Sequence, residues 1–255
     1  MHKIILSAPF GNYLDWDFCT PTIGSFTRKF RGGKWYRLWR VLKTVRYYPG
    51  IGAWKNKLGL PNPGIESLND EGIHRKILSI AGFSVQDWLH LIRAAIHAKP
   101  GWIELNMSCP NVPGEDKSNY SDVLSMVSSV IGEYRDRLII KLPPVGYMQI
   151  VKEAIVRHGL NNFHCCNTLP TPGGGLSGKP LMQLSLQAIT SIRGVYQIDY
   201  PGRLIGGGGV TCEDDVKTYL DRGATNVAVG SCLFFPWKWN TIKRIARNYA
   251  HSECG

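Results

Sequence analysis

The amino-acid sequence predicts an α/β fold, a single-domain (β/α)8 barrel, from three observations. Eight short apolar segments alternate with helical patterns along 255 residues, as βα units do in a parallel sheet. Eight such units in this length match the size of a (β/α)8 barrel. The glycine-rich stretch at 205–210 lacks G-x-G-x-x-G and falls at the seventh strand, which disfavours a dinucleotide-binding sheet. A strand count does not close a barrel, so a doubly wound sheet remains the alternative.

The strands are expected at residues 4–8, 22–27, 76–82, 102–108, 137–142, 162–167, 203–209 and 226–231. Helices are expected between them. Ser84 can cap a helix that has Asp87 in its first turn and apolar residues at helical spacing. Thr211 can cap a helix that starts with acidic residues and stops before Gly223. Further helices are expected over 120–135, 146–158, 180–193 and 236–250.

Residues 28–75 do not fit this alternation, because they are long, basic and aromatic. We predict that they leave the barrel as an excursion over its mouth. No linker or repeat marks a second domain, so one domain is expected across residues 1–255.

The net charge of +11 is concentrated in this excursion. No acidic residue lies between Asp17 and Glu66, and the same window contains ten cations: Arg28, Lys29, Arg31, Lys34, Arg37, Arg40, Lys43, Arg46, Lys55 and Lys57. Such a segment can attract anionic substrates, nucleic acid or anionic lipid. Contact with an acidic partner or a membrane surface is therefore expected through residues 28–57. For residues 34–54, a cover over the active site, a dimer contact and a solvated basic surface are the alternatives.

Composition also bears on the cellular location of the protein. No run approaches 18 apolar residues, so no transmembrane segment is expected. The first residues contain a six-residue apolar run, which is short for a signal peptide and fits a strand. Seven cysteines without a C-x-x-C pair do not indicate a disulfide framework, so a cytoplasmic location is expected.

Polar side chains recur where the apolar strands end. In a (β/α)8 barrel the carboxyl ends of the strands carry the active site. The residues concerned are Asn106, Ser108, Cys109 and Asn111 after the fourth strand, Lys141 at the end of the fifth, and Asn167 and Thr168 after the sixth.

Six segments in order extend this pattern: "ELNMSCPNVPG" (104–114), "IIKLPP" (139–144), "CNT" (166–168), "GGLSGKPL" (174–181), "LIGGGGV" (204–210) and "VAVGSCLF" (227–234). Together with the weaker matches "KLGLPNPG" (57–64) and "SIAG" (79–82), they resemble the dihydroorotate dehydrogenases, FMN-dependent barrels of pyrimidine biosynthesis. The resemblance covers most of the chain from about residue 57 onward. It implies oxidation of dihydroorotate to orotate, FMN as cofactor and no metal.

The resemblance places Cys109 as the base of the soluble, cysteine-using class. The base removes the C5 proton of dihydroorotate while FMN takes the C6 hydride. A thiol with a pKa near 8.5 can serve if its surroundings lower that pKa modestly. Free cysteines are more often buried and inert, but the context N-x-S-C-P-N at a strand end favours the catalytic role.

Four residues match the family's orotate-binding positions, namely Asn106, Asn111, Asn167 and Thr168, and the weaker match adds Asn56. An amide offers both a donor and an acceptor, which suits the edge of a pyrimidine ring. Turn formation is the alternative role for asparagine at a strand end.

The remaining matches concern the flavin. Lys141 matches the lysine that contacts the ring near N1 and the C2 carbonyl, where a fixed ammonium stabilises negative charge; a snorkelling lysine at the barrel rim is the alternative. Ser177 and Gly178 match a flavin-contacting turn. Gly208, Gly209, Gly230 and Ser231 match the phosphate site, which barrels build from loops after the last strands. The usual lysine after the second strand is replaced by Arg28 or Lys29.

Two other functions compete with this interpretation. A tRNA-dihydrouridine synthase is a related FMN barrel, and the basic aromatic segment suits RNA, but Ser108 stands where glycine is usual there. An inactive barrel that binds anionic partners is the second. The resemblance also implies a homodimer. It leaves the electron acceptor open, because "SCPNVPG" is typical of the fumarate-using branch and "GGLSGKPL" of the quinone-using branch, with NAD as a third choice.

Overall fold

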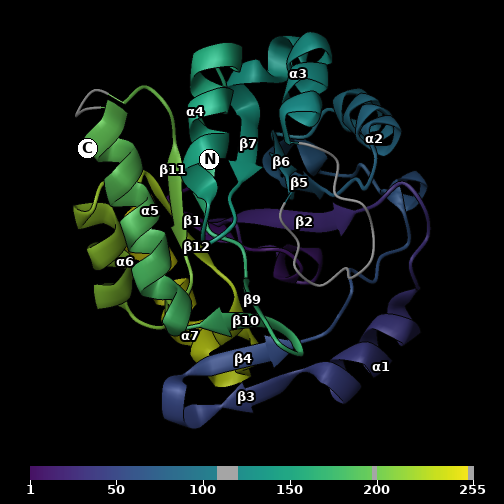
Figure 1. Cartoon of the computed structure of the whole chain (residues 1–255). Coiled ribbons are helices and arrows are strands. Elements are labelled where there is room, and N and C mark those ends of the chain that lie inside the picture. The colour runs from purple at the N-terminus through teal and green to yellow at the C-terminus, as the bar shows by residue number, and fades with distance from the viewer. Residues whose placement is uncertain (108–119, 197–199, 252–255) are drawn as a thin grey trace.

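The computed structural model describes residues 1–107, 120–196 and 200–251, and within them eight parallel strands form a closed barrel (Figure 1). The order around the barrel is β1-β12-β11-β8-β7-β6-β5-β2. All eight predicted strands are confirmed. Their bounds are Ile4–Leu6 (β1), Thr20–Phe26 (β2), Ile77–Ile80 (β5), Trp102–Leu105 (β6), Leu138–Lys141 (β7), Phe163–Cys165 (β8), Leu204–Gly207 (β11) and Asn226–Val229 (β12).

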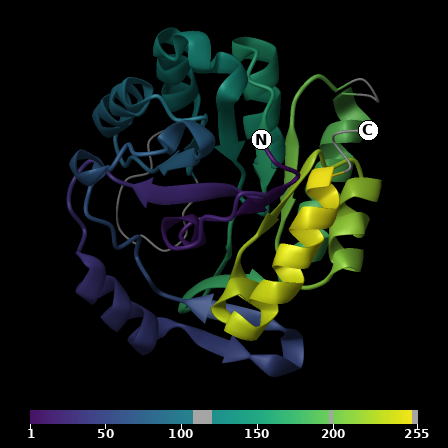
Figure 2. The ribbon, with the colours of Figure 1, turned by 180° about the vertical axis from the view of Figure 1, so that it is seen from behind.

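Helices surround the barrel on its outside (Figures 1 and 2). They are α2 (Val85–Ala98), α3 (Tyr120–Val130), α4 (Tyr147–His158), α5 (Pro180–Tyr196), α6 (Glu213–Asp221) and α7 (Trp239–His251). Short 3-10 turns lie at Phe10–Asn12, Pro49–Ile51, Ile65–Ser67, Ile73–Arg75, Gly132–Arg137, Ser231–Phe234 and Pro236–Lys238. The fold is thus the predicted (β/α)8 barrel.

The caps of two helices test the predicted helix starts. Ser84 caps α2 as expected, because its Oγ accepts a hydrogen bond from the N–H of Asp87 at 3.1 Å. For α6 the prediction was one residue early: the N-cap is Cys212, not Thr211. The carboxylate of Asp215 reaches back and accepts from the N–H groups of Thr211 and Cys212 at 2.8 and 3.2 Å, which satisfies donors that a helix start leaves unpaired.

The side chains that point into the barrel form two layers. Successive residues of a strand point to opposite faces, so one set packs against the helices and the other fills the barrel. The layer nearer the amino ends of the strands is apolar and contains Ile5, Ile77, Ile139, Ile205 and Ala228. Two residues further along β5 and β7 come Ser79 and Lys141, and neighbouring strands add Glu104 and His164. All four of these polar residues are buried. The barrel is therefore filled by hydrocarbon at one end and by polar groups toward the carboxyl ends of its strands.

The excursion between β2 and β5 contains a helix and a hairpin. The helix is α1 (Lys34–Thr44), and the hairpin is β3 (Arg46–Tyr48) with β4 (Ala53–Asn56). β4 also pairs with β10 (Gly174–Gly178), which pairs with β9 (Leu169–Thr171), so that four antiparallel strands form a second sheet in the order β3-β4-β10-β9. Because β9 and β10 follow the carboxyl end of β8, this sheet lies at the end of the barrel where the polar layer is (Figure 1).

Candidate active site

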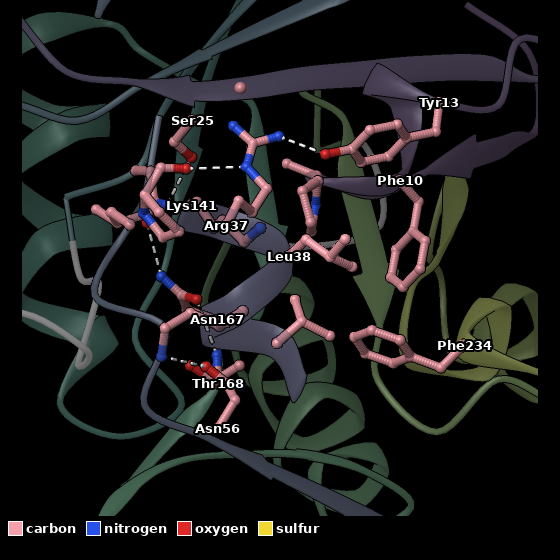
Figure 3. A pocket seen from close by; sticks show the side chains of 18 of the residues that line it. Phe10, Tyr13, Ser25, Arg37, Leu38, Asn56, Lys141, Asn167, Thr168 and Phe234 are labelled. Atoms are coloured by element: carbon pink, nitrogen blue, oxygen red, sulfur yellow. Dashed lines mark hydrogen bonds between the residues drawn. The ribbon is translucent and has the colours of Figure 1, made fainter. Parts of the chain in front are cut away.

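Two adjoining cavities open between the polar layer and the second sheet. The larger has a volume of about 400 Å³ and is shown in Figure 3. The smaller, of about 150 Å³, extends toward the loops after β11 and β12. Asn56, Lys141, Asn167 and Thr168 line both. In Figure 3 these polar side chains lie on one side of the larger cavity, and Phe10, Phe234 and Leu38 lie on the other. The site thus has one face that can hydrogen-bond a ligand and one that can pack against a flat ring.

Glu104 is the centre of the polar layer beneath the cavities. Its Oε1 accepts a hydrogen bond from Ser79 Oγ at 2.9 Å and lies 3.7 Å from Lys141 Nζ. Its Oε2 lies 2.7 Å from His164 Nδ1. Burial alone would raise the pKa of Glu104, but the charge of Lys141 and the contacts with His164 and Ser79 lower it to about 2. Glu104 is therefore ionised and holds the ammonium of Lys141 in place.

His164 is neutral in this environment. Burial lowers its pKa, and the nearby Lys141 lowers it further, although Glu104 acts in the opposite direction. Since the carboxylate of Glu104 is an acceptor, the Nδ1–H of His164 donates to it, which leaves Nε2 as the basic nitrogen of the ring. His164 also lines the smaller cavity.

A chain of hydrogen bonds connects this layer with the amides of the cavity wall. Ser25 Oγ lies 2.7 Å from Ser79 Oγ and accepts from Asn106 Nδ2 at 2.9 Å. Asn167 Nδ2 donates to Asn106 Oδ1 at 2.7 Å, and Asn167 Oδ1 accepts from the N–H of Thr168 at 2.9 Å. Both amides are therefore fixed in orientation before a ligand binds, which is the condition for precise recognition.

The second sheet extends the polar side of the cavities. Asn56 is the last residue of β4 and pairs in register with Gly175 of β10. Ser177 and Gly178, at the end of β10, line the smaller cavity. The excursion and the segment after β8 thus bring one predicted substrate residue beside two predicted cofactor residues.

Glycines shape the far end of the smaller cavity, which Gly208, Gly209, Gly230 and Ser231 line. Gly208 and Gly209 have φ of +110° and +74°, a region that side chains disfavour. A Cβ on Gly208 would lie 2.7 Å from Leu181 Cβ, and one on Gly209 would lie 3.0 Å from Lys179 Cα. Neither glycine has room for a side chain, so this end of the cavity is lined largely by backbone, as in the recesses that receive a phosphate.

These residues fit a flavin mononucleotide. The glycine recess suits a phosphate, and Lys141 supplies positive charge at the middle of the site. Thr168 Oγ1 is buried and has no hydrogen-bond partner within the part of the chain that the structure describes. A buried hydroxyl in that state is expected where a ligand completes the bonding.

Three predicted residues stand apart from this group. Cys109 and Asn111 lie outside the described residues. Arg28 does not line either cavity: its guanidinium forms an ion pair of 3.4 Å with Asp87, and its side chain is 44% exposed. Lys29 lies with Arg28 at the same surface depression. The chain leaves the barrel immediately after β2, which carries both cations away from the cavities, so we omit them from the site.

Sequence reasoning missed the residues beneath the cavity. Ser25, Ser79, Glu104 and His164 were not predicted as site residues. A signal for two of them was present, because "WIEL" and "NFHCC" place an ionisable residue inside an apolar strand, and buried ionisable side chains are rare unless paired.

The fold and this site together define a (β/α)8-barrel enzyme with its active site at the carboxyl ends of the strands. Residues 10–251 match the family model described as dihydroorotate dehydrogenase, and the chain belongs to this family, whose members are flavin-dependent oxidoreductases. The family match favours this assignment over the tRNA-dihydrouridine synthase alternative.

Curated relatives agree with the family match. The catalytic subunit of dihydroorotate dehydrogenase B (NAD(+)) from Alkaliphilus oremlandii is 29% identical over 224 residues, which cover 77% of this chain and 72% of the relative. Probable dihydroorotate dehydrogenase A (fumarate) from Enterococcus faecalis is 28% identical over 207 residues and covers 70% and 67% of the two chains. The crystal structure of dihydroorotate dehydrogenase from Eimeria tenella in complex with ferulenol has the same fold, with a TM-score of 0.76 at 15% identity over 98% of this chain and 82% of that one.

Among the described residues, no helix combines the length and the apolar character needed to cross a lipid bilayer.

Proposed function

We propose that the chain oxidises dihydroorotate to orotate with FMN as its cofactor, as one FMN-binding barrel domain spanning residues 1–255. The observation that supports this most strongly is the meeting of three asparagines and Lys141 around one cavity: Asn56 comes from the second sheet, and Asn106 and Asn167 follow β6 and β8. They are far apart in the sequence, so their meeting is a property of the fold.

The amides bind and orient the substrate in this proposal. A dihydropyrimidine carries alternating N–H and C=O groups, and each amide can donate to one and accept from the other. Asn106 and Asn167 are held by each other and by Ser25, so they present fixed donors and acceptors. Phe10, Leu38 and Phe234 line the apolar side and exclude water.

Lys141 and the glycines hold the cofactor. Bound FMN supplies the acceptor for the hydride from C6 of the substrate. Lys141 places a positive charge where negative charge develops during this transfer, and Glu104 keeps the ammonium in place from below. Gly208, Gly209, Gly230 and Ser231 would hold the phosphate, and Ser177 and Gly178 would contact the flavin.

Cys109 is proposed as the base that removes the C5 proton. This role rests on the sequence: Cys109 follows Asn106 by three residues, within the motif that the family resemblance identifies. The thiolate takes the proton as the C5–H bond breaks, while the hydride leaves from C6, so that the C5=C6 double bond of orotate forms.

The proposal is tested with purified enzyme under anaerobic conditions. The preparation is expected to be yellow with a flavin spectrum, and dihydroorotate is expected to bleach it. A colourless preparation would favour the inactive barrel. A bound flavin that dihydroorotate does not reduce would favour the tRNA-dihydrouridine synthase alternative. Cys109→Ala is expected to keep the flavin and lose its reduction, and Cys109→Ser to retain some activity at high pH. Full turnover by Cys109→Ala would contradict the assigned base.

Three further properties complete the proposal. Relatives of the NAD(+) and fumarate types match at similar identity, so identity does not distinguish the electron acceptors. Measured turnover with fumarate, NAD and a soluble quinone identifies the acceptor. A homodimer is supported by the resemblance to the dimeric branch, and light scattering measures it. A cytoplasmic location is supported by the free thiols of Cys19, Cys165, Cys166, Cys212 and Cys232.

A further inference from the structure

Helix α1 has the reverse of the usual orientation of an amphipathic helix. Its apolar residues Trp35, Leu38, Trp39 and Leu42 recur at i, i+3, i+4 and i+7, which is the stripe that ordinarily packs against a core. Here most of the stripe is exposed to solvent: Trp35 is 80% exposed and Leu42 is 70% exposed. Trp35 and Leu38 also reach the larger cavity, so that edge of the stripe adjoins the site. By contrast, Trp88 in the equivalent stripe of α2 is 2% exposed.

The polar side of α1 is the side that holds it to the protein. Arg37 donates from Nε to the carbonyl of Pro61 at 3.1 Å and from Nη1 to Tyr13 Oη at 2.7 Å (Figure 3). Arg40 donates from Nε to the carbonyl of Leu58 at 3.3 Å. Two arginines on one side of the helix therefore fix its rotation, and this rotation turns the stripe toward solvent.

The hairpin beside α1 extends the apolar surface. Both views show α1 and the hairpin of β3 and β4 along the same edge of the molecule (Figures 1 and 2). Tyr47, Tyr48 and Ile51 of the hairpin are exposed. Trp237 is exposed as well, and it stacks on Phe235, which packs against Tyr47. We call the surface formed by the stripe, these hairpin residues and Trp237 the apolar edge. Exposed apolar side chains gathered along one edge of a protein are typical of a binding surface.

Charge decides what this surface binds. The apolar edge belongs almost wholly to the acid-free window between Asp17 and Glu66, and exposed Lys43 and Arg46 adjoin the stripe. In a symmetric dimer the same patch would face itself, which would bring two clusters of like charge together at an energetic cost. An anionic bilayer has the opposite charge and an apolar interior below it. Exposed Trp, Tyr and Leu with flanking Lys and Arg are the composition of a helix that lies in a membrane interface.

We propose that the apolar edge docks this protein on the surface of an anionic membrane, with α1 lying in the plane of the interface. Trp39 and Leu42 enter the boundary between headgroups and acyl chains, and Lys43 and Arg46 pair with lipid phosphates. Arg37 and Arg40 stay on the protein side and keep the helix attached to the barrel. The protein binds the membrane peripherally through this edge.

The test is flotation of the 255-residue chain with vesicles of phosphatidylcholine, with and without phosphatidylglycerol. We expect binding that requires phosphatidylglycerol and weakens as salt is raised. W39S/L42S removes apolar contact without touching the cavity lining, and K43E reverses one charge; each is expected to weaken binding roughly tenfold or more. The matched controls are V156S/V195S, which removes exposed apolar residues on α4 and α5, and K152E, and both are expected to bind as the unmodified protein does.

Thermal unfolding establishes that the variants are folded, and light scattering gives their mass. Absence of binding by the unmodified protein would overturn the proposal. So would equal binding by W39S/L42S, because adsorption would then be by charge alone. A change of oligomeric mass in W39S/L42S would also overturn it, since the apolar edge would then be covered by a second copy.

Discussion

Glu104 is a carboxylate buried in the centre of the barrel, and its three partners explain how it remains ionised there. Ser79, Lys141 and His164 each satisfy part of its hydrogen-bonding capacity. Glu104 holds the ammonium of Lys141 from the barrel interior, on the side away from the cavity. An ammonium held in this way can act on developing charge without reorganising during the reaction.

Removal of this charge tests the arrangement. Glu104→Gln is expected to lower the free energy of unfolding by about 3 kcal/mol, because Lys141 is then buried without its counter-charge. Urea denaturation of the two proteins measures the difference. E104Q/K141M removes both charges and is expected to recover part of the loss. Equal stability of E104Q and the unmodified protein would show that Lys141 does not depend on Glu104.

The hydrogen-bonded amides of Asn106 and Asn167 can be tested by mutation. Asn106→Ala and Asn167→Ala are each expected to raise the Kd for orotate roughly tenfold, because each removes a bond to the ligand and the support of the other amide. In the double variant, Kd is expected to rise by less than the product of the two single increases, because each single variant already breaks the hydrogen bond between Asn167 and Asn106. Calorimetric titration measures this, with exposed Asn69→Ala as the control. Independent effects would contradict the shared bond.

The second sheet is the element that the sequence could not predict. Each barrel strand has a local signature in an apolar run of about the right length, so all eight were found. The pairing of residues 53–56 with residues 175–178 has no local signature, because the two strands are more than a hundred residues apart. The position of Arg28 has a different cause: the excursion starts at residue 28 as expected, but the direction in which it carries Arg28, away from the cavities, cannot be inferred from the segment alone.

The candidate site divides in the same way. Asn106, Lys141 and Asn167 were predictable because they stand where strands end, and the barrel brings those ends together. The roles of Ser25 and Ser79 were not, because a serine in a strand gives no sign of its hydrogen-bond partners. The start of α6 was misplaced by one residue because Asp215 bonds two successive N–H groups, and either could have been taken as the cap.

The pairing of β4 with β10 can be tested at Gly174. Gly174 has φ of +133°, and a Cβ there would lie 2.2 Å from the carbonyl oxygen of Asn56. Gly174→Val is expected to separate β4 from β10, displace Asn56 and raise KM for dihydroorotate at least tenfold. Steady-state kinetics measures it. Gly50→Ala, in the hairpin but without a neighbour within 4 Å, is the control, and an unchanged KM in G174V would exclude Asn56 from substrate binding.

The polar layer affects the stability of the whole molecule as a function of pH. The pKa of His164 is below its ordinary 6.5 in the folded state, so below that pH the unfolded chain binds a proton that the folded chain does not. The pKa of Glu104 is lowered from 4.5 to about 2, so between these values the unfolded chain again binds more protons. Since stability falls with decreasing pH wherever the unfolded state binds more protons, both groups destabilise the fold in acid.

The two contributions are separable by mutation. His164→Gln keeps a donor toward Glu104 but does not titrate, so it is expected to flatten the loss of stability between pH 6.5 and 4.5 and to leave the loss below 4.5. Urea unfolding at a series of pH values measures the slope. Exposed His97→Gln is the control and is expected to keep the slope of the unmodified protein. An unchanged slope in H164Q would mean that His164 does not carry the effect.

The pairing of β4 with β10 has a consequence for the order in which ligands bind. Asn56 lies on β4, and Ser177 and Gly178 lie on the adjacent strand β10; four residue pairs join the two strands. A ligand that orders one strand also orders the other, which lowers the entropy cost that the second ligand meets. Flavin and orotate are therefore expected to bind with positive cooperativity, and because such coupling is reciprocal, each raises the affinity for the other by the same factor.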